Sequence, residues 1–190
     1  MTTVSDIAEI LTRADNGQRC EDYADTHRRV RTFATRELLE GGHVVDRRGT
    51  VDYPAIEVYR AALLDALANM GLDHVALGVV MDAGAERQFQ ANFAPSQIAD
   101  GVAKPLGSFE DAVRGIAAGE NWRLIVATFP PMAVEIDGFH CGKGLHARFE
   151  WSGDAIAMPI ERFDGAKPRA LLTVNLASLW RPLVEILDAS

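Results

Sequence analysis

Histidine, cysteine and lysine side chains gather in one short glycine-rich stretch, residues 138–146 (GFHCGKGLH). Imidazole nitrogens and a thiolate suit zinc better than magnesium or calcium, which makes His140, Cys141 and His146 the candidate ligands. A zinc site normally takes four protein ligands, or three and a water, and the ligands come in recognisable pairs. The stretch has neither a CxxC nor an HxxxH pair, so we expect no metal site, and the sequence identifies no cofactor.

The same stretch is suited to thiol chemistry. A cysteine becomes a nucleophile when a nearby cation or histidine lowers the pKa of its thiol. Neighbouring residues on a strand point to opposite faces, so His140 is badly placed as the base for Cys141. His146, or a histidine from the N-terminal half, is the better candidate. We therefore take Cys141 and His146 as candidate catalytic residues and His140 and Lys143 as candidate ligand-binding residues. The alternative is a plain hairpin connection, in which Cys141 is a small buried side chain and His146 faces solvent.

A second cluster is basic and lies in the N-terminal half. It consists of residues 27–31 (HRRVR) with Arg36, followed by residues 46–49 (DRRG). A helix of arginines followed by a small turn resembles the helix-and-wing layout of some DNA-binding proteins. The net charge is -8, from 19 basic and 27 acidic residues, and such a surface repels phosphate backbones. We therefore expect no nucleic-acid partner, and expect Arg28 and Arg31 to bind an anionic small molecule or an acidic partner. The alternative is a solvated helix face that pairs with neighbouring carboxylates.

The elements that carry the basic cluster are predicted to be helical with one hairpin. Apolar residues recur at helical spacing over residues 4–11, with Thr3 or Ser5 as the cap, and more loosely over residues 21–40. A glycine pair after residue 40 is expected to end the second helix. Residues 43–45 and 50–53 are expected to pair as short strands. Pro54 and Gly71 bracket a third helix over residues 54–70.

The other half of the chain is predicted to be rich in strands. The continuous apolar run at residues 74–81 (HVALGVVM) is interpreted as a buried strand. Residues 82–107 are interpreted as mostly loop, and a helix is expected from Ser108 to Gly119.

Residues 122–175 are predicted to form a mainly antiparallel sheet, with clear alternation at 145–151, a turn at 152–154 and a strand at 155–160. A last helix is expected to begin at Ser178, with Pro182 in its opening turn.

Composition and length describe one ordinary acidic globular domain. The chain has 190 residues, 48% hydrophobic and 24% charged, and only two cysteines. No apolar run is long enough to span a membrane and the first residues do not resemble a secretory signal, so we expect a cytoplasmic protein with free thiols and no membrane partner. We predict a single α+β domain over 1–190, with a helical part over about 1–71 and a sheet-rich part over about 72–190. The helical N-terminal layer would pack on a mainly antiparallel sheet closed by a C-terminal helix.

Two functions of different class remain open. The first is a small-molecule enzyme of unknown reaction with its site near the loop from His140 to His146. The second is a non-catalytic regulatory module that binds a ligand or a partner through the arginine-bearing helix and an aromatic sheet face. The sequence leaves a homo-oligomer open and identifies no substrate.

Overall fold

The chain is an α+β protein in which antiparallel sheets accompany six described helices. The computed structural model describes residues 2–14, 23–85, 109–128, 135–136, 139–140, 145–151 and 169–189. The helices are α1 (Val4–Ala14), α2 (Tyr23–Thr35), α3 (Ile56–Asn69), α4 (His74–Ala85), α5 (Phe109–Ala117) and α6 (Leu176–Asp188). The strands are β1 (Thr2–Thr3), β2 (His43–Val44), β3 (Val51–Tyr53), β4 (Trp122–Thr128), β5 (Glu135–Ile136), β6 (Phe139–His140), β7 (Leu145–Trp151) and β8 (Ala170–Asn175).

The contacts divide the chain into two units. Unit 1 comprises Met1–Leu77 with Ser178–Ser190, and unit 2 comprises Gly78–Ala177. The sequence-based expectation of one domain, with a helical layer packed against a sheet, concerns the relation between these units and stays a prediction. The α+β class itself is confirmed.

The first helix of unit 1 is capped as the sequence predicts. The Thr3 hydroxyl accepts the backbone N–H of Asp6 at 3.3 Å, and a carboxylate oxygen of Asp6 accepts the backbone N–H of Thr3 at 2.8 Å. This reciprocal arrangement satisfies N–H groups that have no partner inside the helix. Ile7, Ala8 and Leu11 form the buried stripe of α1.

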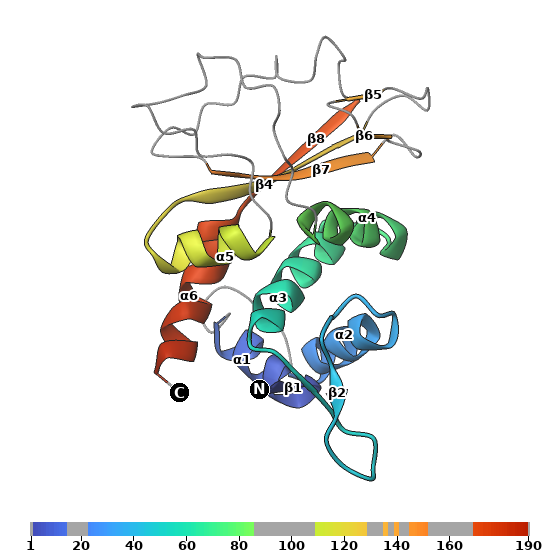
Figure 1. Ribbon diagram of the computed structural model, residues 1–190, viewed down its shortest axis with the longest axis vertical. Coiled ribbons are helices and arrows are strands. Elements are labelled where there is room, and N and C mark those ends of the chain that lie inside the picture. The colour runs from blue at the N-terminus through green and yellow to red at the C-terminus, as the bar shows by residue number, and fades with distance from the viewer. Residues whose placement is uncertain are drawn as a thin grey trace. The chain divides into compact units, whose positions relative to one another are not determined.

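The short strands of unit 1 form one three-stranded antiparallel sheet. β2 and β3 pair as the predicted hairpin, with Val44 opposite Val51. The sequence did not predict β1, which pairs with β3 and gives the order β1-β3-β2. The hairpin loop extends away from α1 and α2 in the view of Figure 1.

The predicted third helix is confirmed as α3, and it is the centre of unit 1. Every residue from Glu57 to Leu67 is buried, as expected of a helix with neighbours on all sides. α3 contacts both α1 and α2, and the Tyr59 ring meets the Trp180 ring of α6 edge-on at 5.9 Å. Gly71, with a φ of 92°, ends the helix as predicted.

The second helix ends earlier than the glycine pair that was expected to end it. α2 stops at Thr35, and Glu37 takes the left-handed conformation with a φ of 56°. The N–H of Leu38 then bonds to the carbonyl of Phe33 at 3.0 Å, and the N–H of Glu37 to that of Ala34 at 3.1 Å. These two bonds make a Schellman motif with a non-glycine residue at its left-handed position. Nothing in the sequence indicated that the helix ends here, because glutamate is rare in the left-handed conformation.

The prediction of a strand at residues 74–81 is wrong, because these residues belong to α4. A carboxylate oxygen of Asp73 accepts the backbone N–H groups of Val75 and Ala76 at 3.0 and 2.9 Å, which caps a helix. The buried residues Leu77, Val80 and Met81 then follow helical spacing. A short, wholly apolar run does not separate strand from helix by periodicity. Asp73, as a residue that can cap a helix directly before the run, is the signal in the sequence that favours a helix over a strand.

The described strands of unit 2 confirm the predicted antiparallel sheet. β4 lies between β7 and β8 and pairs antiparallel with both, and β5 pairs with β6. α5, at the predicted position, contacts β4 and β7, and its Phe109 ring meets that of Phe149 edge-on at 6.0 Å. The predicted turn at 152–154 and strand at 155–160 lie outside the described residues.

The last helix begins two residues before the predicted Ser178. Leu176, Trp180 and Leu183 are buried at helical spacing, so the apolar stripe already begins at the end of β8. Pro182 consequently lies inside α6 rather than in its opening turn. In the interior of a helix, proline removes the bond to the carbonyl four residues earlier and bends the helix locally. In the part of the chain that the structure describes, no helix has the length and apolar character needed to cross a membrane.

Candidate nucleic-acid interface

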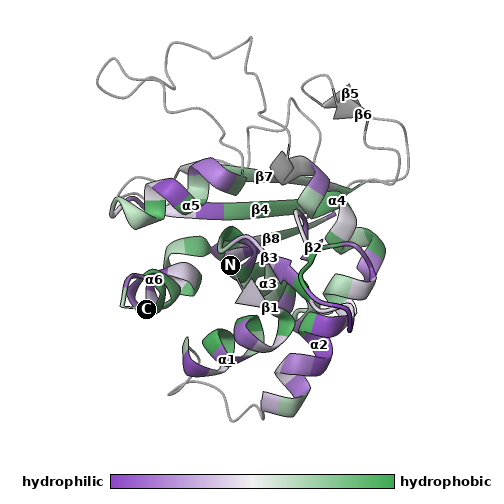
Figure 2. Cartoon of the chain, turned by 60° about the horizontal axis from the view of Figure 1, so that its bottom comes forward, coloured by the Kyte–Doolittle hydropathy of each residue, from purple (hydrophilic) through white to green (hydrophobic). Residues whose placement is uncertain are grey.

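Helix α2 has an apolar face on one side and a basic face on the other. Thr26, Val30 and Phe33 are its buried residues, and their spacing of four and three places them on one side of the helix. Arg28 and Arg31 are exposed, which places them on the other side. Figure 2 shows hydrophilic and hydrophobic residues interleaved along α2, as this division requires.

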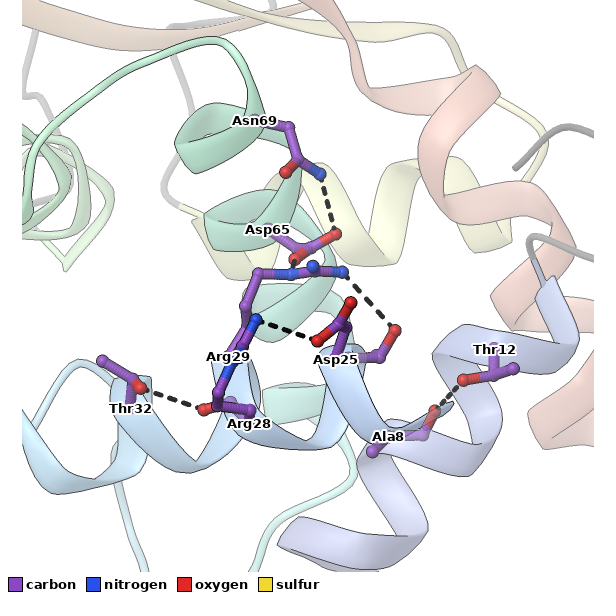
Figure 3. Close-up of polar contacts among 9 residues, drawn as sticks. Ala8, Thr12, Asp25, Arg28, Arg29, Thr32, Asp65 and Asn69 are labelled. Carbon is purple, nitrogen blue, oxygen red and sulfur yellow. Dashed lines mark hydrogen bonds and ion pairs between the residues drawn. The ribbon is translucent and has the colours of Figure 1, made fainter. Parts of the chain in front are cut away.

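An ion pair links α2 to α3. Arg29, at the border of the buried stripe, pairs through Nε with a carboxylate oxygen of Asp65 (Figure 3). Asn69 donates to the other oxygen of Asp65 at 3.2 Å, and a terminal nitrogen of Arg29 lies 3.4 Å from the Thr26 hydroxyl. The side chains of Arg29 and Asp65 are only 23% and 9% exposed. Arg29 is therefore a structural residue, although it lies among arginines that face solvent.

Arg28 differs from Arg29 in its surroundings. Its guanidinium lies 2.8 Å from Asp25 on the same helix, with the two side chains 75% and 54% exposed. An exposed pair one turn apart adds little stability, and water competes for both groups. Arg28 is therefore available to a partner that carries negative charge.

The hairpin is held by the aspartate at the start of its turn. One carboxylate oxygen of Asp46 accepts the N–H groups of Arg48 and Thr50, each at 2.9 Å, and the other accepts the Thr50 hydroxyl at 2.8 Å. The bonds from Thr50 are the main reason that the pKa of Asp46 lies below its ordinary value. Gly49 completes the turn with a φ of 81°. Arg47 and Arg48 are both exposed on this ordered loop.

A network of two buried charges, Glu57 and Arg60, and the exposed Glu40 connects α3 to the segment between α2 and the hairpin. Glu57 is 2% exposed, and its carboxylate accepts the backbone N–H of Glu40 at 2.9 Å. Arg60 lies 3.1 Å from Glu57 and donates twice to Glu40, at 2.7 and 3.1 Å. Burial raises the pKa of Glu57 despite the Glu40 N–H and the charge of Arg60. Burial and then the charge of Glu57 raise the pKa of Tyr53 on β3.

These contacts tie both basic elements to the same support. Arg29 joins α2 to α3, and Glu57 holds the chain where it leaves α2 for the hairpin. The arrangement presents exposed arginines on a helix and on a turn of the same unit. Such a surface can bind a polyanion at several points.

The described structure does not test the candidate residues of the glycine-rich stretch, whose side chains it does not describe. His140 lies on β6 with Glu135 as its register partner, and His146 lies on β7 opposite Ala127. Cys141 and Lys143 lie outside the described residues, and the side chains of His140 and His146 are likewise not described. The thiol and ligand-binding roles assigned to these four residues stay predictions. Where side chains are described, no three histidine, cysteine or carboxylate groups are placed to hold a metal ion.

Two of the predicted ligand-binding residues, Arg28 and Arg31, are on the exposed face of α2. The sequence missed Thr32 and Thr35, which are also exposed there, although each follows one of these arginines by four residues. The predicted aromatic sheet face is not a surface where it is described, because Trp122 and Phe149 are buried.

Comparison with protein-family models, with curated proteins and with solved structures found no match to this chain.

Proposed function

We propose that this protein is a non-catalytic regulatory module that binds double-stranded DNA. Helix α2 would lie in the major groove, and the β2–β3 hairpin would contact the flanking backbone through Arg47 and Arg48. The major groove is about 12 Å wide and admits one helix with its side chains. The observation that carries the proposal is the exposed basic face of α2, with Arg28 and Arg31, on the same unit as an ordered arginine-bearing turn.

This proposal departs from the expectation drawn from net charge. The segment from Tyr23 to Tyr53 holds six arginines and five carboxylates, so all of the chain's acidic excess lies elsewhere. Of those carboxylates, Glu40 is paired with Arg60, and Asp46 is hydrogen-bonded inside its turn. Binding to phosphate depends on the local potential of a surface more than on total charge.

The support for α2 also fits this role. In a helix-turn-helix protein, one helix enters the major groove while the preceding helix packs across it. α1 and α2 contact each other extensively. Eight residues separate them, more than the three or four of a tight helix-turn-helix. The ion pair from Arg29 to Asp65 and the contacts with α3 supply the constraint that a short turn would supply.

The experiment is a binding titration of the full chain with a fluorescein-labelled duplex of random sequence at low salt. Arg31→Ala and Arg47→Ala should each weaken binding. Loss of one arginine contact with the duplex at low salt is expected to lower affinity by about three- to tenfold. Arg114→Ala is the matched control, because Arg114 is an exposed arginine on α5 of unit 2. Failure of the wild-type chain to bind duplex, or equal losses in all three variants, would reject the proposal.

The enzyme hypothesis for Cys141 and His146 remains a prediction, since none of the described contacts involves their side chains. Its test, the labelling rate of the Cys141 thiol, is independent of DNA binding.

A further inference from the structure

Two threonines share the exposed face of α2 with its arginines. Thr32 and Thr35 are exposed and follow Arg28 and Arg31 by one helical turn each. The Thr32 hydroxyl donates to the carbonyl of Arg28, and the Thr35 hydroxyl donates to the carbonyl of Arg31, both at 2.9 Å. Figure 3 shows the first of these bonds.

This hydrogen bonding limits what the two threonines can offer a partner. A hydroxyl carries one proton, and in both residues that proton is used inside the helix. What remains is a γ-methyl group and an acceptor lone pair. Thr12 makes the same kind of bond to Ala8 at 2.8 Å, but it is half-buried on α1. The bond itself is therefore ordinary, and the exposure of Thr32 and Thr35 beside two arginines sets them apart.

The remaining chemistry matches one base in the major groove. Thymine is the base that presents a methyl group there, and threonine methyls contact it. Arginine side chains on the same face suit the guanine O6 and N7 acceptors. Because Thr32 and Thr35 are three residues apart, both can face the same groove.

We infer that Thr32 and Thr35 are specificity-determining residues that select thymine through their methyl groups. This inference rests on the proposed function, since it assumes that α2 enters the major groove. A competing interpretation uses the hydroxyl lone pair as an acceptor for an adenine or cytosine amino group. The two interpretations differ in whether the methyl or the hydroxyl must be kept.

The experiment starts from a duplex selected by the wild-type full chain from a randomised library. Each thymine of that duplex is replaced in turn by deoxyuridine, which removes the 5-methyl group and keeps the pairing edge. At one or more positions, affinity for the wild-type chain should fall about fourfold, the value for one buried methyl group. Thr32→Val and Thr35→Val keep the methyl and should keep this sensitivity. Thr32→Ser and Thr35→Ser keep the hydroxyl and should lose the sensitivity at the position that each residue reads.

The outcomes separate this inference from the proposed function. If the wild-type chain binds duplex but deoxyuridine has no effect, or the serine variants stay fully sensitive, thymine selection is overturned and DNA binding stands. Loss of sensitivity in the valine variants, with circular dichroism unchanged, would also overturn it in favour of the hydroxyl. If the wild-type chain binds no duplex even at low salt, both the inference and the proposed function fail.

Discussion

Arg29 on α2 pairs with Asp65 on α3, 36 residues further along the chain, while the adjacent Arg28 pairs with Asp25 on its own helix. Two neighbouring arginines of one basic cluster therefore have different roles. Arg29 joins the helix to α3, and Arg28 remains exposed to a partner. Helix α2 therefore has one arginine that joins it to α3 and another that lies on its exposed basic face.

Arg29→Ala is expected to destabilise the fold, whereas Arg28→Ala is not. Removing Arg29 leaves the mostly buried Asp65 carboxylate without its cation, which should lower the free energy of unfolding by about 2 kcal/mol. Arg28→Ala removes only an exposed pair and should change it by less than about 0.5 kcal/mol. Urea unfolding followed by circular dichroism measures both. Equal effects of the two substitutions would contradict the assignment of roles.

Glu57 should make stability depend on pH in a direction opposite to that of most carboxylates. Its pKa is raised in the folded state, so the folded chain holds that proton more tightly than the unfolded chain does. Stability from this group is therefore lost as the pH rises from about 4.5, the ordinary value, through the folded pKa. Glu57→Gln keeps an acceptor for the Glu40 N–H but cannot ionise.

The free energy of unfolding of wild type minus that of Glu57→Gln should accordingly decrease between pH 4.5 and neutral pH. Urea titrations at several pH values give this difference, and titration of other groups cancels in it. A difference that stays constant, or grows with pH, would show that burial does not dominate the environment of Glu57.

Glu37→Gly is expected to stabilise the protein. Glu37 is exposed and takes a φ of 56° where α2 ends, a conformation that costs an L-residue about 1 kcal/mol relative to glycine. The gain should appear as a higher urea midpoint with an unchanged slope. Glu37→Ala is the control, because it removes the charge but keeps Cβ and should gain nothing. A gain with alanine as large as with glycine would attribute the effect to charge.

The enzyme hypothesis makes a prediction of its own at the glycine-rich stretch. If Cys141 is an activated thiol, iodoacetamide should label it near neutral pH much faster than Cys20, because cationic neighbours favour the thiolate. Mass spectrometry of the two cysteine peptides gives both rates in one sample. Slow labelling at equal rates would remove Cys141 from consideration as a nucleophile.

Local signals in the sequence were sufficient for part of this fold. Pro54 and Gly71 bracket α3, Thr3 caps α1, and the alternation over residues 145–151 becomes β7. Each of these elements is determined by residues a few positions apart. The prediction of a strand from the apolar run at 74–81 was wrong because strands and buried helices share that composition.

The candidate site was harder to predict because contacts between residues far apart in the sequence decide which arginines are exposed. The sequence grouped Arg28, Arg29 and Arg31 together, and only the distant Asp65 separates the second from the others. The negative net charge of the whole chain also gave no indication that arginines outnumber carboxylates from α2 to the hairpin. Thr32 and Thr35 were overlooked because threonine carries no charge or reactive group. Their one-turn spacing from Arg28 and Arg31 was the available signal.

The salt dependence of duplex binding tests the central claim most directly. If α2 and the hairpin neutralise phosphates, the logarithm of the association constant should fall linearly with the logarithm of salt concentration. The slope should become shallower by about one in Arg47→Ala, and should not change in Arg114→Ala. Absence of salt-dependent binding by the wild-type chain, or identical slopes for wild type and Arg47→Ala, would contradict the account of this surface as a DNA interface.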